Sequence, residues 1–536
     1  MVLGAGQGTG MSAAAHSAAP AETGASAASP WLIAILVALA AFMEVLDTTV
    51  VNVVLPYIAG GMGVSDDEAS WAVTTYLVAN AVSLTASPFL ARRLSRKVFF
   101  LSCLALFTLS SLFCAQAWNL DSLLLFRLLQ GLAGGGMVPV SQSMLADAFP
   151  PSKRGQAFAL FGVAVVVAPV VGPTLGGWLA YDFSWRWCFS INVPVGLATI
   201  GLIAMLLPDQ IKTEPVGRFD LVGFLLISTF LGALEVVLDR GLEDDWFGSN
   251  FIVVMTAVAG LAFVLMIPWE ATRRDPMIDV RMVATRQFGA CFVVMLATGA
   301  ILFATTQFLP LLVQTDFGYT AIWAGLVLSP GGVVTFVMMF VVGRLTSRIQ
   351  PKYLIMTGAF IAAVSMHQLT GVYGGLDFWF FAKTRMLLGV GLPLIFIPML
   401  TASYDGVPPS RIDMASALIN AARNTGGSIG ISLANNVLWH REQFHQARLA
   451  EKTIPSSIQY QETLHQATQH FLAHGSLPSQ AQGQAIAWIG QEAALQASYL
   501  AYSDVFWTLM LLALAAIPLA MTLRRVKLGG AAPAAH

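Results

Sequence analysis

Two carboxyl side chains stand within a long apolar run near the N-terminus, where an ionised group is costly. Glu44 and Asp47 are three residues apart and therefore share one face of a helix. A charged side chain in hydrocarbon costs at least about 2.5–3.5 kcal/mol unless it faces protein or water. Burial beside a second carboxyl favours reversible protonation, so we expect the pair to carry a proton, with either residue as the carrier. In the alternative interpretation, Asp47 bonds to Thr48, Thr49 or Asn52 and only stabilises helix packing.

Arginines inside apolar runs form a second set of candidates. Arg127 lies three residues before Gln130, and because a guanidinium keeps its proton, Arg127 needs a partner or a wet cavity. We expect it to tune a nearby proton-carrying carboxyl, and a structural counter-ion is the alternative. Arg423 also lies deep in its run, and Glu235, near a helix end, is a further proton-coupling candidate for which a packing role is the alternative. Arg385 stands near the start of its run and is expected to snorkel.

Small residues recur at helical spacing in two other runs. Gly172 and Gly176 lie in one run, and Gly426 and Gly430 lie in the other. Small residues on one face let helices approach closely and slide. The residues that we predict to line a substrate cavity or to pack helices are Asn52, Gln130, Gly172, Pro173, Gly176 and Arg423.

A basic loop follows the second apolar run and contains Arg92, Arg93 and Arg96. The simplest explanation is the positive-charge bias that orients membrane proteins. The alternative is a conformational latch, in which these arginines pair with acidic groups or helix C-termini and hold one state closed.

Composition places the chain in a membrane. Of its 536 residues, 56% are hydrophobic and 11% are charged, against roughly 45–50% and about 25% in soluble domains. The net charge of −1 argues against a nucleic-acid partner. The four cysteines lie in apolar runs and indicate no metal site. The sequence contains no phosphate-binding loop and no nucleophile and base pattern, so we expect no enzyme and no cofactor, with the proton motive force as the energy source.

Fourteen apolar runs of spanning length follow Trp31. Their ranges are 31–56, 69–90, 98–117, 120–145, 156–180, 186–207, 219–238, 251–269, 288–313, 320–342, 353–371, 378–402, 414–438 and 501–523. Most Lys and Arg residues lie in loops on the side of the N-terminus, which places both termini in the cytoplasm. The N-terminal segment lacks the basic region of a signal peptide and is expected to be a disordered tail.

The two halves of the chain repeat one another. A shift of 258 residues aligns Arg127 with Arg385 and Gly131 with Gly389, which indicates a duplicated unit with a site between the halves. The predicted fold is all-α and polytopic, with two six-helix bundles and an inserted helix pair. Its predicted parts are a cytoplasmic tail (1–30), a first bundle (31–207), a linker with the inserted pair (208–287), a second bundle (288–525) that includes an external loop (440–500), and a second tail (526–536).

These motifs resemble the major facilitator superfamily, specifically its fourteen-helix drug:proton antiporter branch (EmrB/QacA type). Residues 46–56 resemble the first-helix signature of that branch, which places Asp47 at its acidic position. Residues 127–131 are similar to the fourth-helix motif, whose arginine is implicated in proton transfer. Residues 172–177 resemble the helix-five antiporter motif, and residues 185–196 resemble a block typical of the branch.

The resemblance implies multidrug efflux, in which lipophilic or cationic compounds leave across the inner membrane in exchange for protons. The external loop 440–500 is similar to that of Gram-negative members that work with a periplasmic adaptor and an outer-membrane channel. The loop 91–97 departs from the family pattern, because Arg and Ser replace the usual Gly and Asp. The alternatives are an exporter dedicated to one metabolite, such as a fatty acid or siderophore, and a non-transporting membrane sensor or scaffold.

Overall fold

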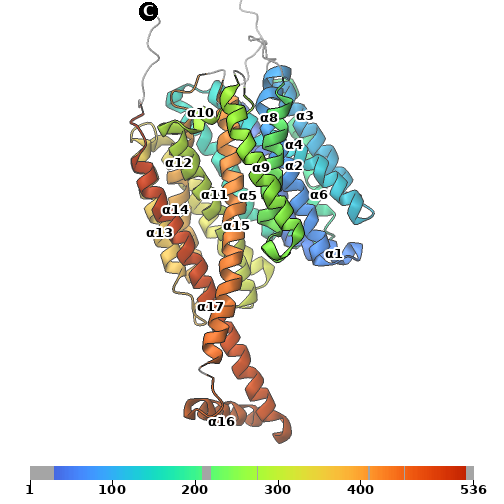
Figure 1. Cartoon of the computed structure of the whole chain (residues 1–536), viewed down its shortest axis with the longest axis vertical. Helices are drawn as coiled ribbons and strands as arrows, with labels where there is room; N and C mark the ends of the chain where they lie inside the picture. Colours follow the sequence, from blue (N-terminus) through green and yellow to red (C-terminus); the bar gives the residue numbers. More distant parts are fainter. Residues whose placement is uncertain (1–28, 208–218, 274–275, 409–410, 452, 527–536) are drawn as a thin grey trace, which may run out of the picture.

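The computed structural model is built from helices packed lengthwise (Figure 1). It describes residues 29–207, 219–273, 276–408, 411–451 and 453–526. The two predicted tails lie outside the described residues, apart from residues 29, 30 and 526, and so does part of the predicted linker.

The helices follow one another without an intervening strand in this described part. Their bounds are α1 (Pro30–Met62), α2 (Asp66–Leu94), α3 (Arg96–Ala115), α4 (Leu120–Ala148), α5 (Pro151–Asp182), α6 (Trp187–Ser190), α7 (Asn192–Leu206), α8 (Leu221–Arg240), the 3₁₀ turn η1 (Trp246–Gly248), α9 (Asn250–Thr272), α10 (Val280–Val283), α11 (Arg286–Thr315), α12 (Ala321–Leu345), α13 (Pro351–Leu369), α14 (Phe378–Ser403), α15 (Ile412–Ala450), α16 (Ile458–Ala473) and α17 (Pro478–Met521).

A helix occupies each of the fourteen predicted runs, and the run 186–207 is divided between α6 and α7. By length and hydropathy, 11 helices in the described ranges are candidate membrane spans, or up to 12 if the bent α5 counts as one. The two remaining runs correspond to α13 and α15. The chain is therefore a multi-pass membrane protein, and its arrangement is consistent with fourteen crossings.

Local signals explain where several helices begin and end. A capping box joins Ser65 and Glu68 at the start of α2, and Gly63, with φ of 69°, ends α1 in the left-handed conformation. Ser95 separates α2 from α3 with φ of 82°, which is a region that favours glycine. Its hydroxyl accepts a hydrogen bond from the Val98 amide at 3.4 Å. The basic loop thus stores backbone strain.

The two bundles are built from equivalent helix contacts. In the first, α1 packs on α5, α4 packs on α2 and α3, and α3 packs on α7. In the second, α11 packs on α15, α14 packs on α12 and α13, and α13 packs on α17. This correspondence agrees with the duplication that the sequence indicates.

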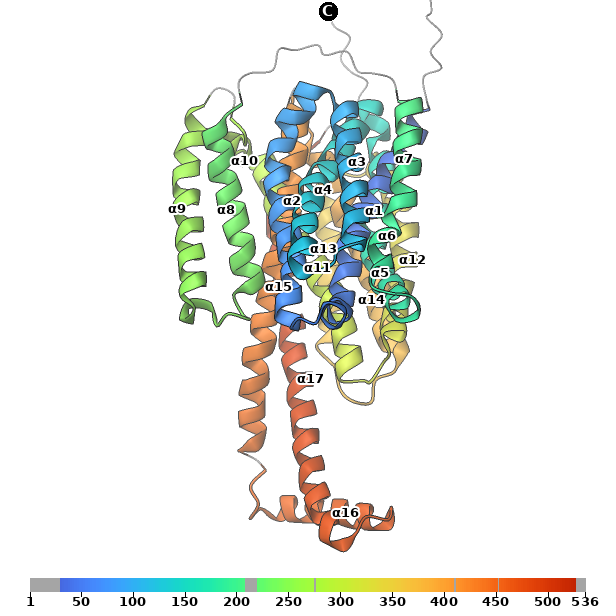
Figure 2. The same cartoon turned by 90° about the vertical axis from the view of Figure 1, so that its right-hand side faces the viewer.

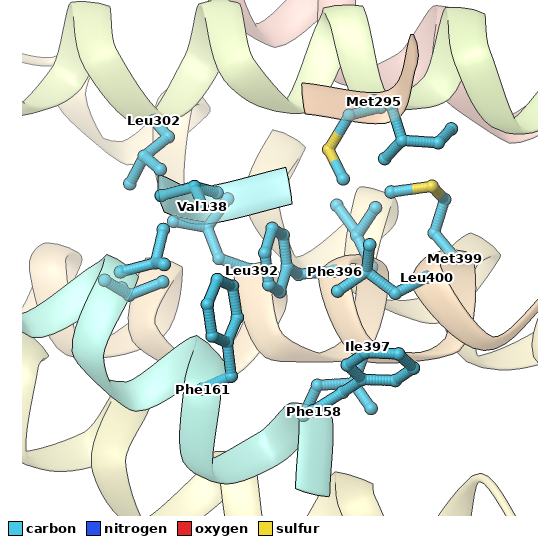
Figure 3. Packing of buried hydrophobic residues seen from close by; sticks show 14 of the residues in the cluster. Val138, Phe158, Phe161, Met295, Leu302, Leu392, Phe396, Ile397, Met399 and Leu400 are labelled. Carbon is cyan, nitrogen blue, oxygen red and sulfur yellow. The ribbon is translucent and has the colours of Figure 1, made fainter. Parts of the chain in front are cut away.

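The bundles meet along α5 with α12, and along α2 and α4 with α15. Apolar side chains from both bundles fill the space between them (Figure 3). The labelled residues are Val138, Phe158, Phe161, Met295, Leu302, Leu392, Phe396, Ile397, Met399 and Leu400. Phe158 also stacks on Tyr404 with ring centroids 5.6 Å apart. Burial of these side chains stabilises the contact between the bundles.

The inserted pair, α8 and α9, lies on one flank of the molecule (Figure 2). The two helices pack on each other, and α8 also packs on α2 of the first bundle and α15 of the second. The inserted pair therefore covers the seam between the bundles.

The predicted external loop, 440–500, is largely helical. The outer parts of α15 and α17 extend beyond the bundles together with α16, and we call residues 440–500 the projection (Figures 1 and 2). Leu464 and Ala467 of α16 are buried against Ala485 of α17. At its base, Asp504 accepts a hydrogen bond from Arg441 at 2.5 Å. The sequence of this segment contains helix-like portions, such as 441–452, and apolar contacts within the projection allow its helices to continue outside the bundles.

Candidate functional site: a polar pocket between the bundles

Asp47 is enclosed by donors from α4 and α7. Its Oδ2 accepts a hydrogen bond from Arg127 Nη1 at 2.6 Å. Its Oδ1 accepts from Gln130 Nε2 at 2.9 Å and from Asn192 Nδ2 at 2.8 Å. The side chains of Asp47 and Arg127 are completely buried. The structure thus brings together the predicted residues Asp47, Arg127 and Gln130, and it adds Asn192, which sequence reasoning missed.

Arg127 joins three helices. Its Nε donates to the Ala72 carbonyl of α2 at 3.0 Å, and its guanidinium lies 4.2 Å from the centroid of the Tyr76 ring. Two of the alternative partners for Asp47, Thr48 and Thr49, donate their hydroxyls to carbonyls of their own helix instead. The Asp47–Arg127 pair therefore links α1, α2 and α4.

A pocket of about 960 Å³, including space open to solvent, lies beside this network. It is lined by α1, α2, α8, α11 and α15, so both bundles and the inserted pair contribute. Its polar lining residues are Glu44, Thr48, Thr49, Asn52, Tyr76, Asn80, Glu235, Arg423, Asn424, Thr425 and Ser428. Asp47, Arg127 and Gln130 are not among the lining residues, so the pair lies behind the pocket wall.

Glu44 and Glu235 bring two buried carboxyls to this pocket. Glu44 is 6% exposed, and its Oε1 accepts a hydrogen bond from Asn80 Nδ2 at 3.0 Å. Glu235 is 7% exposed, and its Oε1 accepts from Ser428 Oγ at 2.6 Å. The sequence places Glu235 near a helix end without indicating what it faces, and the packing of α8 on α2 and α15 turns it toward the pocket.

Arg423 faces the same pocket and is 4% exposed. Its Nε and Nη2 donate to Asn424 Oδ1 at 3.3 and 3.1 Å, whereas its Nη1 has no hydrogen-bond partner. Asn52, also predicted for the cavity, lies exposed in the lining. Two predicted cavity residues thus reach the pocket directly.

The predicted glycines make close helix contacts. A Cβ added to Gly172 would lie 2.8 Å from Thr49 Cβ, and one added to Gly176 would lie 3.0 Å from Val50 Cγ1. One added to Gly426 of α15 would lie 2.7 Å from the carbonyl carbon of Leu296 on α11. Pro173 lies next to Gly172 in the second segment of α5 (Val171–Asp182), which meets the first segment (Lys153–Pro169) at 43°. Both bundles therefore use small residues where their first and fifth helices meet.

Arg385 does not snorkel, contrary to the expectation from its position in the sequence. It is 5% exposed, and it donates to the hydroxyls of Thr305 and Thr306 at 3.0 Å each. Thr305 corresponds to Asp47 at the shift of 258 residues. The second bundle therefore keeps the buried arginine but has a hydroxyl in place of the carboxyl.

Arg96 joins the bundles at the end of the molecule opposite the projection. Its Nε and Nη2 donate to the Asp413 carboxylate at 2.8 and 3.0 Å, and its Nη1 contacts Asp147 at the end of α4. Arg92 donates to a carbonyl of its own helix, and Arg93 is exposed. The structure describes no ion pair for either of these two. Of the predicted latch residues, only Arg96 makes the expected contact.

The comparisons with known proteins agree with this architecture. A family model described as Major Facilitator Superfamily matches residues 37–431. The chain belongs to the major facilitator superfamily. The superfamily member "Multidrug export protein EmrB" of Escherichia coli (strain K12) is 34% identical over 478 residues, which cover 89% of this chain and 92% of that protein. "Fatty acid resistance protein FarB" of Neisseria gonorrhoeae is 33% identical over 493 residues, which cover 92% and 96%.

Solved structures of the superfamily share the fold. The proton:xylose symporter XylE aligns with a TM-score of 0.54 at 13% identity, covering 90% of this chain and 94% of that one. The human organic anion transporter MFSD10 (TETRAN) aligns with a TM-score of 0.55 at 13% identity, covering 90% and 99%. These likenesses confirm the predicted superfamily fold.

Proposed function

We propose that this protein is a proton-coupled multidrug exporter that moves lipophilic or cationic small molecules by alternating access. The observation that carries the proposal is the meeting of two buried carboxyls, Glu44 and Glu235, in one pocket between the bundles. Apolar walls and a few polar groups suit varied amphiphilic substrates. The relatives named for multidrug export support this substrate range.

In this proposal, Glu44 carries the proton. Its Oε2 is buried without a hydrogen-bond partner, and it lines the pocket where a cationic substrate can replace the proton. Asp47 acts as a positioning residue, because its ion pair with Arg127 holds α1 against α4. Glu235 is the second candidate carrier. The proton motive force supplies the energy without a cofactor, since one charge crossing the membrane yields about 2.3 kcal/mol per 100 mV.

The proposed location is the inner membrane, with both termini in the cytoplasm. The basic loops support this orientation, which places the projection outside. Several apolar side chains of the projection are exposed, including Ile458 and Leu477. Such a surface fits the proposed contact with a periplasmic adaptor and, through it, an outer-membrane channel.

We also propose that Arg96 latches the cytoplasmic end. Replacing Arg96 with glutamine removes charge-assisted hydrogen bonds to Asp413 and the contact with Asp147. Since such bonds contribute about 1.5–3 kcal/mol, we expect the population open at this end to rise at least about tenfold. Electron spin resonance distances between labels at exposed positions 93 and 347 measure this change.

Arg92→Gln is the matched control for the latch, because Arg92 is exposed and bonds only within its own helix. It should leave the distances unchanged. Identical distance distributions for wild type and Arg96→Gln would show that Arg96 does not act as a latch.

Substrate-driven proton release from reconstituted liposomes tests the proposed function. We expect lipophilic cations of different shapes to drive proton release by the wild-type protein. A response restricted to fatty acids would favour a dedicated exporter, which the relative FarB also suggests. Proton flux that no compound elicits, in liposomes where binding is detected, would contradict antiport and favour the sensor or scaffold interpretation.

A further inference from the structure

Three buried groups in the pocket each have one polar atom without a hydrogen-bond partner, and one of them is the neutral hydroxyl of Tyr76. The other two are charged groups, and their atoms are Oε2 of Glu44, on α1, and Nη1 of Arg423, on α15. Both side chains line the pocket and are more than nine-tenths buried. One is an acceptor that can carry a negative charge, and the other is a cationic donor. Buried groups of this kind normally have hydrogen-bond partners. The pocket therefore lacks a cationic donor for Glu44 and an anionic acceptor for Arg423.

The two groups do not satisfy each other in the structure. Glu44 and Arg423 form no ion pair within 4.0 Å in the part of the chain that the structure describes. Each has a separate anchor, since Asn80 donates to Glu44 Oε1 and Asn424 accepts from Arg423. The anchors come from α2 and α15, and both charged groups face one space.

The apolar part of the lining is suited to an apolar body. Leu77, Leu231, Phe303 and Ile431 belong to the pocket and come from α2, α8, α11 and α15. A ligand with one charge would satisfy only one of the two groups. A cation would leave Arg423 Nη1 without a partner, and an anion would leave Glu44 Oε2 in the same state.

We infer that the pocket selects zwitterionic amphiphiles whose ammonium and carboxylate groups lie close together. The ammonium donates to Glu44 Oε2, the carboxylate accepts from Arg423 Nη1, and the apolar body lies along the leucine and phenylalanine side chains. This inference rests on the pocket of the proposed function and specifies its substrate class. The incoming ammonium takes the place of a proton on Glu44, and the carboxylate satisfies Arg423 without using the proton site.

Four ligands with the same twelve-carbon length test the inference. They are 2-aminododecanoic acid, with adjacent charges, 12-aminododecanoic acid, with charges at opposite ends, dodecylamine and dodecanoic acid. We would measure Kd for the full-length protein in nanodiscs by isothermal titration calorimetry, with empty nanodiscs as the reference for partitioning. We expect 2-aminododecanoic acid to bind at least about tenfold more tightly than each of the other three, because one charged hydrogen bond contributes about this factor.

Variants of Arg423 and Glu44 test which charged group of the ligand each residue binds. Arg423→Gln should weaken binding of 2-aminododecanoic acid about tenfold and leave dodecylamine unchanged. Glu44→Gln should weaken the same zwitterion and leave dodecanoic acid unchanged. Arg385→Gln is the matched control, because Arg385 is a buried arginine outside the pocket lining, and it should preserve the order of affinities.

The wild-type ligand order tests the inference even where a variant does not fold. Equal affinities for the four ligands, or preference for a single charge, would overturn it. The measurement needs no gradient, so its result is separate from that of the liposome test. Selective binding without proton release would refute the proposed transport and support the inferred ligand class. Proton release without a preference for the zwitterion would support the proposed transport and refute the inferred ligand class.

Discussion

Replacing Glu44 with glutamine is expected to reduce substrate-driven proton release to background. Glutamine keeps the size of the side chain and an acceptor for Asn80, but it does not exchange a proton. Because Glu44 faces the pocket and its Oε2 has no other partner, its loss removes the site at which proton and cation compete. Internal and external pH indicators in liposomes, with substrate added on one side, measure the coupled flux.

Glu270→Gln is the control for this change. Glu270 is buried on α9, outside the pocket lining, and its Oε2 accepts from the Ile278 amide at 3.1 Å. Flux normalised to folded protein should remain near that of wild type. Full coupling in Glu44→Gln would refute Glu44 as the carrier, and Glu235→Gln would then be tested in the same assay.

Replacing Asp47 with asparagine is expected to destabilise the protein by about 3–5 kcal/mol, because it leaves Arg127 buried without a counter-charge. The new amide would also place a donor toward Arg127 or toward the amide donors of Gln130 and Asn192. Removing both charges, in Asp47→Asn with Arg127→Gln, should recover part of this loss. A double-mutant cycle of denaturant unfolding measures the coupling between the two residues.

The second bundle offers a comparison at the repeat-related position. Thr305→Val removes a neutral hydroxyl from Arg385 and should cost about 1 kcal/mol. If Asp47→Asn unfolds at the same midpoint denaturant concentration as the wild-type protein, the role of the ion pair is contradicted. Because instability also lowers flux, transport by this variant has to be normalised to folded protein before it is compared with Glu44→Gln.

Several features of the site followed from the sequence because their physical causes are local. A membrane requires long apolar helices with internally paired backbone groups, so hydropathy located all fourteen helical runs. A buried guanidinium needs a partner, and Arg127 has one in Asp47. Glycine spacing likewise predicted close helix contacts at Gly172 and Gly426.

Other features depend on which helix lies opposite which. Asp47 and Glu44 share a helical face in the sequence, yet only Glu44 lines the pocket, because α4 and α7 enclose Asp47. Glu235 reaches the same pocket because α8 packs across the seam between the bundles. The period of 3.6 residues shows which residues share one face of a helix, but it does not show which other helix packs against that face.

The sequence by itself determined the helices and the types of charged residue available for transport, since composition and periodicity specify a membrane helix without reference to the rest of the chain. Residues repeated at one shift indicated the duplication, and short motifs carried the resemblance to the superfamily. Only the tertiary structure decided that Glu44, Glu235 and Arg423 meet in one pocket, that Arg96 is the predicted latch residue that pairs with Asp413 of the second bundle, and that residues 440–500 form a helical projection. These contacts join residues far apart in the chain, and their geometry depends on the rotation and packing of whole helices.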